Sequence, residues 1–206
     1  MRVFDWVSFL RRWSRAVLAR DDASECFPPE IVATDWIGYA GATEEQITRA
    51  EARLGIRLPP SYRAFLAVSN GWRFRTHVTS GLWPVEDIEW FAVRHREWID
   101  AWMGGVAMAR AEYGAWDPVA DDDYLVYGAR QDSTLSFRDE YLETALAISP
   151  NQPDDSAIYL LNPQTVTVDG EWETWFFADW LQGAHRYQSF QEMMQAEYET
   201  DRTDKS

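Results

Sequence analysis

Apolar residues recur at the helical period in the first part of the chain and suggest two helical regions. Residues 2–19 predict an amphipathic helix, because apolar side chains return every three or four positions between arginines. Residues 21–42 predict a loop-rich connector broken by Pro28-Pro29 and by Gly38 and Gly41. The apolar positions of the predicted helix are Phe4 or Val3, Val7, Leu10, Val17 and Leu18, with Ser14 between them and Trp6 and Trp13 beside them.

Residues 43–72 predict two short helices joined by a tight loop. Thr43 and Gln46 stand at the spacing of a capping box, and Gly55 follows the first helix as a stop. Pro59-Pro60 suits the first turn of the second helix, and Asn70-Gly71 suits its end. The residues that share an apolar face are Ile47, Ala50 and Leu54 in the first helix, and Tyr62, Phe65, Leu66 and Ser69 in the second.

The middle of the chain predicts a short strand at residues 82–85, followed by a helix over residues 93–103. Gly104-Gly105 is expected to end that helix, because glycine is a poor helix former. Residues 106–116 are read either as another helix or as an insertion. Residues 73–80 are polar and β-branched, which predicts a loop or a short strand.

From residue 121 onward the pattern favours strands. We predict strands at residues 124–128, 141–149, 157–161 and 172–178, a turn at Asn162-Pro163 and a hairpin turn at Asp169-Gly170. A last helix is expected over residues 187–198, with 201–206 as a frayed tail. The predicted fold is α+β and a single domain. Its largely antiparallel sheet has about 4–6 strands, with helices packed mainly on one face.

The helical pair carries several uncommon residues in order, which resemble the signature of the SMI1/KNR4 family of the SUKH superfamily. These residues are Ile47, Glu51, Leu54-Gly55, Leu58-Pro59, Tyr62, Phe65, Leu66 and Asn70-Gly71. The resemblance divides the chain into an N-terminal helix (1–20), an SMI1/KNR4-like domain (21–200, signature 43–72) and the tail (201–206). It implies a non-enzymatic binding protein, similar to bacterial immunity proteins that neutralise polymorphic toxins such as nucleases or deaminases.

The charge of the chain narrows the choice of partner. The formal net charge is −15, which argues against binding to nucleic acid or to an anionic membrane. A basic protein partner fits this charge, and so does solubility alone. Residues 1–20 are the exception at +4, and we expect their arginines to face the acidic remainder of the domain.

Few residues suggest a catalytic, disulfide-forming or metal-binding role. Cys26 is the single cysteine, so no intramolecular disulfide can form, and no apolar run is long enough to span a membrane. The N-terminus makes a poor signal peptide, so we expect a cytoplasmic protein. The three histidines, His77, His95 and His185, lack metal-site spacing. The sequence therefore predicts no enzyme, no catalytic residues, no cofactor and no metal.

Acidic and aromatic residues alternate in three places, which makes these places candidates for partner binding. Carboxylates would steer a basic partner and aromatic side chains would anchor it. In the competing interpretation the tryptophans are core residues, which is the commoner role for any one of them, and the acids are merely solvated. The candidates are Trp116, Asp117, Asp121, Asp122, Asp123, Tyr124, Glu171, Trp172 and Glu173.

The functional hypothesis is an immunity protein that occludes a basic toxin domain by stoichiometric binding. The alternative is a regulatory or scaffold protein of the SMI1/KNR4 type with no toxin partner, as the fungal members of the family suggest.

Overall fold

A five-stranded antiparallel sheet runs through the middle of the protein, with its strands in the order β1-β2-β3-β4-β5. The computed structural model describes residues 4–73, 81–114, 119–128, 137–150, 157–181 and 183–203. Each strand pairs with the next one along the chain, so the sheet is a meander. The strands are β1 (Glu89–Trp90), β2 (Leu146–Ala147), β3 (Ala157–Val166), β4 (Trp172–Ala178) and β5 (Ala184–Tyr187).

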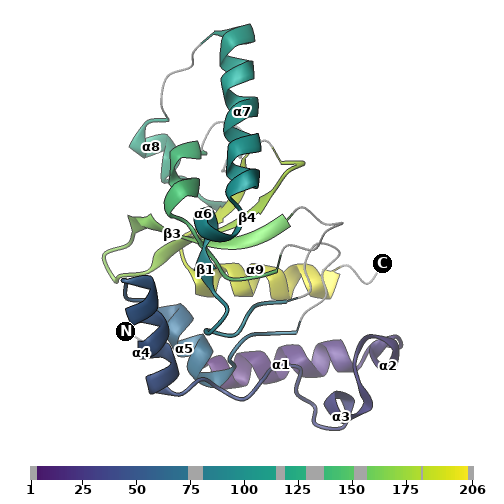
Figure 1. Cartoon of the computed structure of the whole chain (residues 1–206). Coiled ribbons are helices and arrows are strands. Elements are labelled where there is room, and N and C mark those ends of the chain that lie inside the picture. Colours follow the sequence, from purple (N-terminus) through teal and green to yellow (C-terminus); the bar gives the residue numbers. More distant parts are fainter. Residues whose placement is uncertain are drawn as a thin grey trace.

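Helices cover both faces of this sheet (Figure 1). The described helices are α1 (Trp6–Leu18), α2 (Ala23–Cys26), α3 (Pro29–Val32), α4 (Glu44–Leu54), α5 (Pro60–Val68), α6 (Phe91–Arg94), α7 (Arg96–Tyr113), α8 (Asp121–Tyr124), the 3-10 helix η2 (Asp139–Thr144) and α9 (Phe190–Thr203). The predicted α+β domain with an antiparallel sheet is confirmed.

The alternation of side chains along β3 divides the interior into two cores. Tyr159 and Leu161 lie in the larger core, beneath α1, α4, α5 and α9. Ile158 and Leu160 point to the opposite face, where α6, α7 and η2 supply the packing. Because successive residues of a strand face opposite sides, one apolar run fills both cores. Most helices thus share one face, as expected, and a smaller group covers the other.

The helical pair at residues 43–72 forms as predicted. The backbone N–H of Gln46 donates to Thr43 Oγ1 at 3.2 Å, and the backbone N–H of Thr43 donates to Gln46 Oε1 at 2.8 Å. Gly55 ends α4 in the left-handed conformation at φ 72°. Tyr62, Phe65 and Leu66 of α5 are fully buried in the larger core. This stretch is therefore scaffold.

The N-terminal helix belongs to the same core, because Trp6, Leu10 and Trp13 of α1 are buried against the other helices. Asp201, near the end of α9, fixes this helix. Its carboxylate accepts from the indole N–H of Trp13 at 2.9 Å and pairs with Arg20 at 2.7 Å.

Two predictions about the ends of the chain need correction or refinement. The prediction of a frayed tail is wrong for residues 201–203, which continue α9. Residues 204–206 lie outside the described residues. The expectation that the N-terminal arginines face acids holds for Arg20. Arg11 and Arg12 instead lie over the rings of Trp36 and Tyr198, at 5.9 and 5.8 Å.

Several predicted boundaries in the middle of the chain are wrong. Gly104-Gly105 does not end a helix, since α7 runs unbroken from Arg96 to Tyr113. No strand forms at residues 82–85 or 124–128; Leu82 makes one isolated bridge to Trp72. The connector at residues 21–42 contains α2 and α3. In place of the strand expected at 141–149, the chain forms the end of η2, up to Thr144, and then the two-residue β2.

The C-terminal half is partly as predicted. Strand β4 matches residues 172–178, and the hairpin turn holds Gly170 at φ 82°. The turn at Asn162-Pro163 is wrong, because β3 continues to Val166 with an irregular register between Asn162 and Val166. The last helix was expected to begin at residue 187. That position is instead the end of β5, and α9 begins at Phe190.

Candidate functional site

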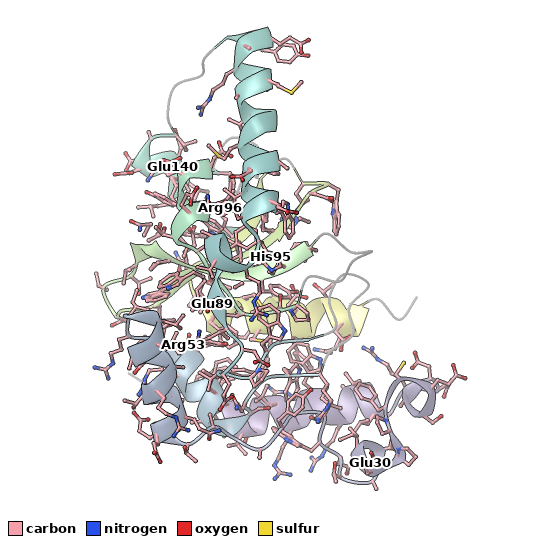
Figure 2. The ribbon with its side chains drawn as sticks, in the orientation of Figure 1. Glu30, Arg53, Glu89, His95, Arg96 and Glu140 are labelled. Atoms are coloured by element: carbon pink, nitrogen blue, oxygen red, sulfur yellow. The ribbon has the colours of Figure 1, made fainter. Side chains whose placement is uncertain are left out.

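The acidic run at residues 121–123 lies on the surface of α8. All three aspartates are exposed, and they occupy the first turn of this short helix. Glu140, on the neighbouring η2, is also exposed and lies beside α8 (Figure 2). We call Asp121, Asp122, Asp123 and Glu140 the acidic rim.

Arg138 connects the two segments that carry the acidic rim. Its Nη2 donates to Asp121 Oδ1 at 2.6 Å and to the Val119 carbonyl at 2.8 Å, and its Nη1 donates to the Tyr141 hydroxyl at 2.9 Å. The guanidinium also lies 4.4 Å from the centre of the Tyr124 ring, at cation–π distance. One half-buried cation thus joins α8 to η2 and leaves the other carboxylates of the rim facing solvent.

Tyr124 connects α8 to the sheet. Its ring is buried, and its hydroxyl donates to Glu173 Oε2 on β4 at 2.7 Å. Burial raises the pKa of Tyr124, and the negative charge of Glu173 raises it further. The phenol therefore stays protonated and acts as a hydrogen-bond donor across the accessible pH range.

Glu173 is a buried carboxylate surrounded by donors. Besides Tyr124, Asn162 Nδ2 and Trp175 Nε1 donate to Oε2 at 2.9 and 2.7 Å. Arg186 Nη1 reaches Oε1 at 2.6 Å from the adjacent strand β5. A buried charge is tolerated when it is paired and its remaining acceptor sites are filled, and Glu173 meets both conditions.

Arg186 completes this network from β5. Its Nη2 donates to the carbonyl oxygens of Tyr124 and Val126, at 2.5 and 3.2 Å. Its guanidinium stacks on the rings of Tyr124 and Tyr127, at 4.1 and 5.0 Å. The pair with Glu173 therefore fixes both the sheet edge and the chain that follows α8, which sets the position of the acidic rim.

The structure separates the predicted binding residues into different roles. Asp121, Asp122 and Asp123 are on the surface, as a contact with a partner requires. Tyr124, Trp172 and Glu173 are buried, which corrects their assignment as surface contacts: they pack in the core or fix α8 to β4. Trp116 and Asp117 lie outside the described residues.

Glu171 has a structural role at the start of α5. Its carboxylate accepts from the backbone N–H and the hydroxyl of Ser61, at 2.9 and 2.6 Å. Because the first N–H groups of a helix have no partner within it, this contact satisfies one of them from the residue that precedes β4. The alternation of Glu171, Trp172 and Glu173 thus reflects the two faces and the end of a strand, not a binding motif.

Sequence reasoning missed the residues that support the site. Arg186 was not singled out, because no strand was predicted between residues 178 and 187, where β5 forms. Asn162 was interpreted as a turn residue, although it is buried and bonded to Glu173. A usable signal was the placement of Glu173 in a strand that is aromatic or apolar at every other position except Thr174, since a buried acid requires a cationic partner.

Polar contacts join α7 to η2, and we call these two helices together with α8 the lobe. Trp102 Nε1 donates to Asp139 Oδ1 at 2.6 Å, and Arg96 makes two 2.7 Å bonds to Glu143. Burial raises the pKa of Asp139. In Figure 2, Arg96 and Glu140 lie on this lobe, far from Glu30 on α3.

A groove of about 640 Å³ runs along β5, between residues 125–128 and α9. Its lining includes the side chains of His185, Arg186 and Glu192, together with Leu125 and Tyr127. His185 stacks on the Phe176 ring at 6.2 Å, and His95 packs beside Phe91 at 5.3 Å. His77 lies outside the described residues.

Within the described ranges, no three histidine, cysteine, aspartate or glutamate side chains are grouped to hold a metal ion. In the same ranges, no helix is long and apolar enough to cross a membrane.

A second acid with a perturbed pKa, Glu197, lies on the inner side of α9. Burial raises its pKa to about 7, the charge of Asp201 adds to this shift, and a hydrogen bond from Tyr159 opposes it. A group whose pKa is raised on folding stabilises the protein fully below its unfolded pKa. That stabilisation is lost as the pH rises through the folded value, here between about 4.5 and about 7.

Glu197→Gln is therefore expected to raise the free energy of unfolding at pH 8 by about 1–3 kcal/mol, with a much smaller effect at pH 5. The check is urea unfolding of both proteins at the two pH values. Glu199→Gln, an exposed neighbour on α9, is the control and should show no such pH dependence. Equal effects of Glu197→Gln at both pH values would contradict the assignment.

The sheet meander, its helices and the buried Glu173–Arg186 pair define an α+β domain whose exposed acids are held on a rigid frame. The SMI1 / KNR4 family (SUKH-1) model matches residues 41–196, which is more than half of the chain. The chain belongs to this family, and the resemblance noted in the sequence is confirmed. No curated protein and no solved structure matches it significantly.

Proposed function

We propose that this protein is a non-enzymatic, cytoplasmic immunity protein that neutralises a cognate bacterial toxin by stoichiometric binding. The observation that carries the proposal is the family match over residues 41–196. These residues include the whole sheet, the Glu173–Arg186 pair and the acidic rim.

The electrostatics favour a toxin that acts on nucleic acid, such as a nuclease or deaminase. Such enzymes bind phosphate backbones with basic clefts. A chain with a net charge of −15 presents a field of the same sign as the substrate, and the acidic rim concentrates part of it in one place. Complementary charge steers association and disfavours other partners. The protein would thus compete with the substrate for the cleft.

The mechanism is occlusion by a preorganised surface. The rim is fixed from beneath by Arg138, which bonds to Asp121, and by Tyr124, which bonds to buried Glu173. A surface that is already ordered loses less conformational entropy on binding, so more of the contact energy appears as affinity. No covalent step is required, and one copy of the protein would inactivate one copy of the toxin.

The test is a titration of toxin activity. The probe is the purified catalytic domain of the toxin encoded by the gene adjoining this one, assayed on its own nucleic-acid substrate. Activity should fall linearly with added protein and reach its minimum at a 1:1 ratio. Inactivation by much less than one equivalent would indicate an enzyme, and full activity at a large excess would favour the regulatory or scaffold alternative.

A further inference from the structure

Helix α7 leaves the body of the protein after its first turns (Figure 1). Near its start, Trp98 and Trp102 pack on the Phe177 ring, with centroids 5.2 and 4.9 Å away, and Ile99 is buried. In the described chain, no side chain of α7 beyond Ile99 is buried. The outer part, residues 106–113, extends over roughly 12 Å at the ordinary helical rise.

The outer part nevertheless continues the apolar stripe of the inner part. Val106, Ala109 and Tyr113 follow Trp102 at intervals of four, three and four residues, which places all four on one face of the helix. Tyr113 is 79% exposed, and Val106 and Ala109 are partly exposed. Met108, on another side, is 75% exposed. The outer part of α7 therefore has the apolar pattern of a core-facing helix, although it projects beyond the core.

This stripe lies on the side of α7 that faces η2, since Trp102, on the same face, bonds to Asp139. The lobe formed by residues 96–114, 119–128 and 137–144 contains nine carboxylates and three arginines. Each arginine interacts with an acid of the lobe. Arg96 pairs with Glu143 and Arg138 with Asp121, and the charge of Arg110 acts on Asp139. The described part of the lobe that carries the apolar stripe therefore has an excess of negative charge.

We infer that the stripe of Val106, Ala109 and Tyr113 is the apolar anchor of the toxin interface, and that its occupant is a basic domain with an apolar groove. This inference rests on the proposed function and identifies the surface that performs it. The acidic rim would attract the partner, and the stripe would hold it. Charges mainly accelerate encounter, whereas buried aromatic side chains carry much of the binding energy and slow dissociation.

A second copy of this chain fits the stripe less well than a basic partner does. Two identical copies that met through the stripe with two-fold symmetry would bring their acidic rims toward each other, because such an interface uses the same patch on both subunits. Facing like charges oppose association. A basic partner gains from the same charges, so charge complementarity selects the heterologous complex.

The experiment measures binding of full-length variants to the catalytic domain of the adjoining toxin. Ala109→Arg places bulk and positive charge on the stripe. Ala107→Arg makes the same change on the opposite side of the helix, since two residues correspond to about 200° of rotation. We expect Ala109→Arg to raise Kd by about 30-fold or more, chiefly through faster dissociation, and Ala107→Arg by less than about threefold. Tyr113→Ser should raise Kd by about 10-fold or more.

The outcomes separate the two claims. If the unaltered protein binds and Ala109→Arg and Tyr113→Ser bind equally well, the inference about the stripe is wrong and the proposed function stands. If the unaltered protein does not bind the toxin at all, the proposed function fails and the inference fails with it. If the protein alone is a dimer that Ala109→Arg dissociates, the stated occupant is wrong. Thermal melting of each variant shows that the fold is retained.

Discussion

Replacing Arg186 with methionine is expected to lower the free energy of unfolding by about 3–5 kcal/mol, because it leaves the buried Glu173 carboxylate without its counter-ion. The side chains of both residues are almost completely inaccessible, and their closest atoms are 2.6 Å apart. The change also removes two hydrogen bonds to the carbonyl oxygens of Tyr124 and Val126. The support beneath α8 would be lost with them.

Urea unfolding, followed by circular dichroism, measures this effect, and Arg96→Met is its control. Arg96 pairs with Glu143 at the same kind of distance, 2.7 Å, but at the surface, so its loss should lower the free energy of unfolding far less. Adding Glu173→Gln to Arg186→Met should restore part of the stability, because the uncompensated charge is removed. Equal effects of Arg186→Met and Arg96→Met would contradict a structural role for the buried pair.

Reversing two charges of the acidic rim, Asp122→Lys with Asp123→Lys, is expected to slow association with the toxin domain by about 10–100-fold at low ionic strength. Both side chains are exposed, and Asp121 is left in place to keep its bond to Arg138. Because steering acts through long-range charge, the association rate should change more than the dissociation rate. The difference should shrink as added salt screens the field.

Stopped-flow fluorescence at several salt concentrations measures these rates. The matched control is Asp21→Lys with Asp22→Lys, which makes the same change of charge at an exposed pair of aspartates beside α2. Figure 1 places α2 at the opposite end of the molecule from α8. If both double variants associate at the same rate, net charge alone governs the encounter and the rim has no special part in it.

Local physical chemistry made much of the scaffold predictable. The capping box of Thr43 and Gln46, the left-handed Gly55 and the hairpin turn at Gly170 depend on residues close together in sequence. The central strand was recognisable because residues 157–161 are apolar on both faces. The family match covers all of these residues, so recognition and local rules agreed.

Some errors arose where a local signal was too weak to decide the structure, and others where tertiary contacts outweigh local preference. Gly104-Gly105 lowers helix propensity, but α7 continues through both residues without interruption. Residues 124–127 are the aromatic, aliphatic and β-branched types that strands favour, yet Tyr124 is turned inward to reach Glu173 and no strand forms. Pro163 suggested a turn, but β3 accommodates it within an irregular part of its pairing with β4.

The site was predictable only in its exposed part. A run of three aspartates is visible in the sequence and reaches the surface as expected. Its support was not visible, because Glu173, Arg186 and Tyr124 come from three segments that only the fold brings together. The interpretation of Trp172 and Glu173 as binding residues failed for the same reason: alternation along a strand also describes the two faces of a sheet.

Co-expression in a bacterial host tests the central claim most directly. The adjoining toxin domain is induced from one plasmid with this protein, its Asp122→Lys and Asp123→Lys variant, or an empty vector on a second plasmid, and colonies are counted. The account predicts that cells with the unaltered protein survive, that cells with the empty vector die, and that the variant protects less well. Equal killing with and without the unaltered protein would contradict it.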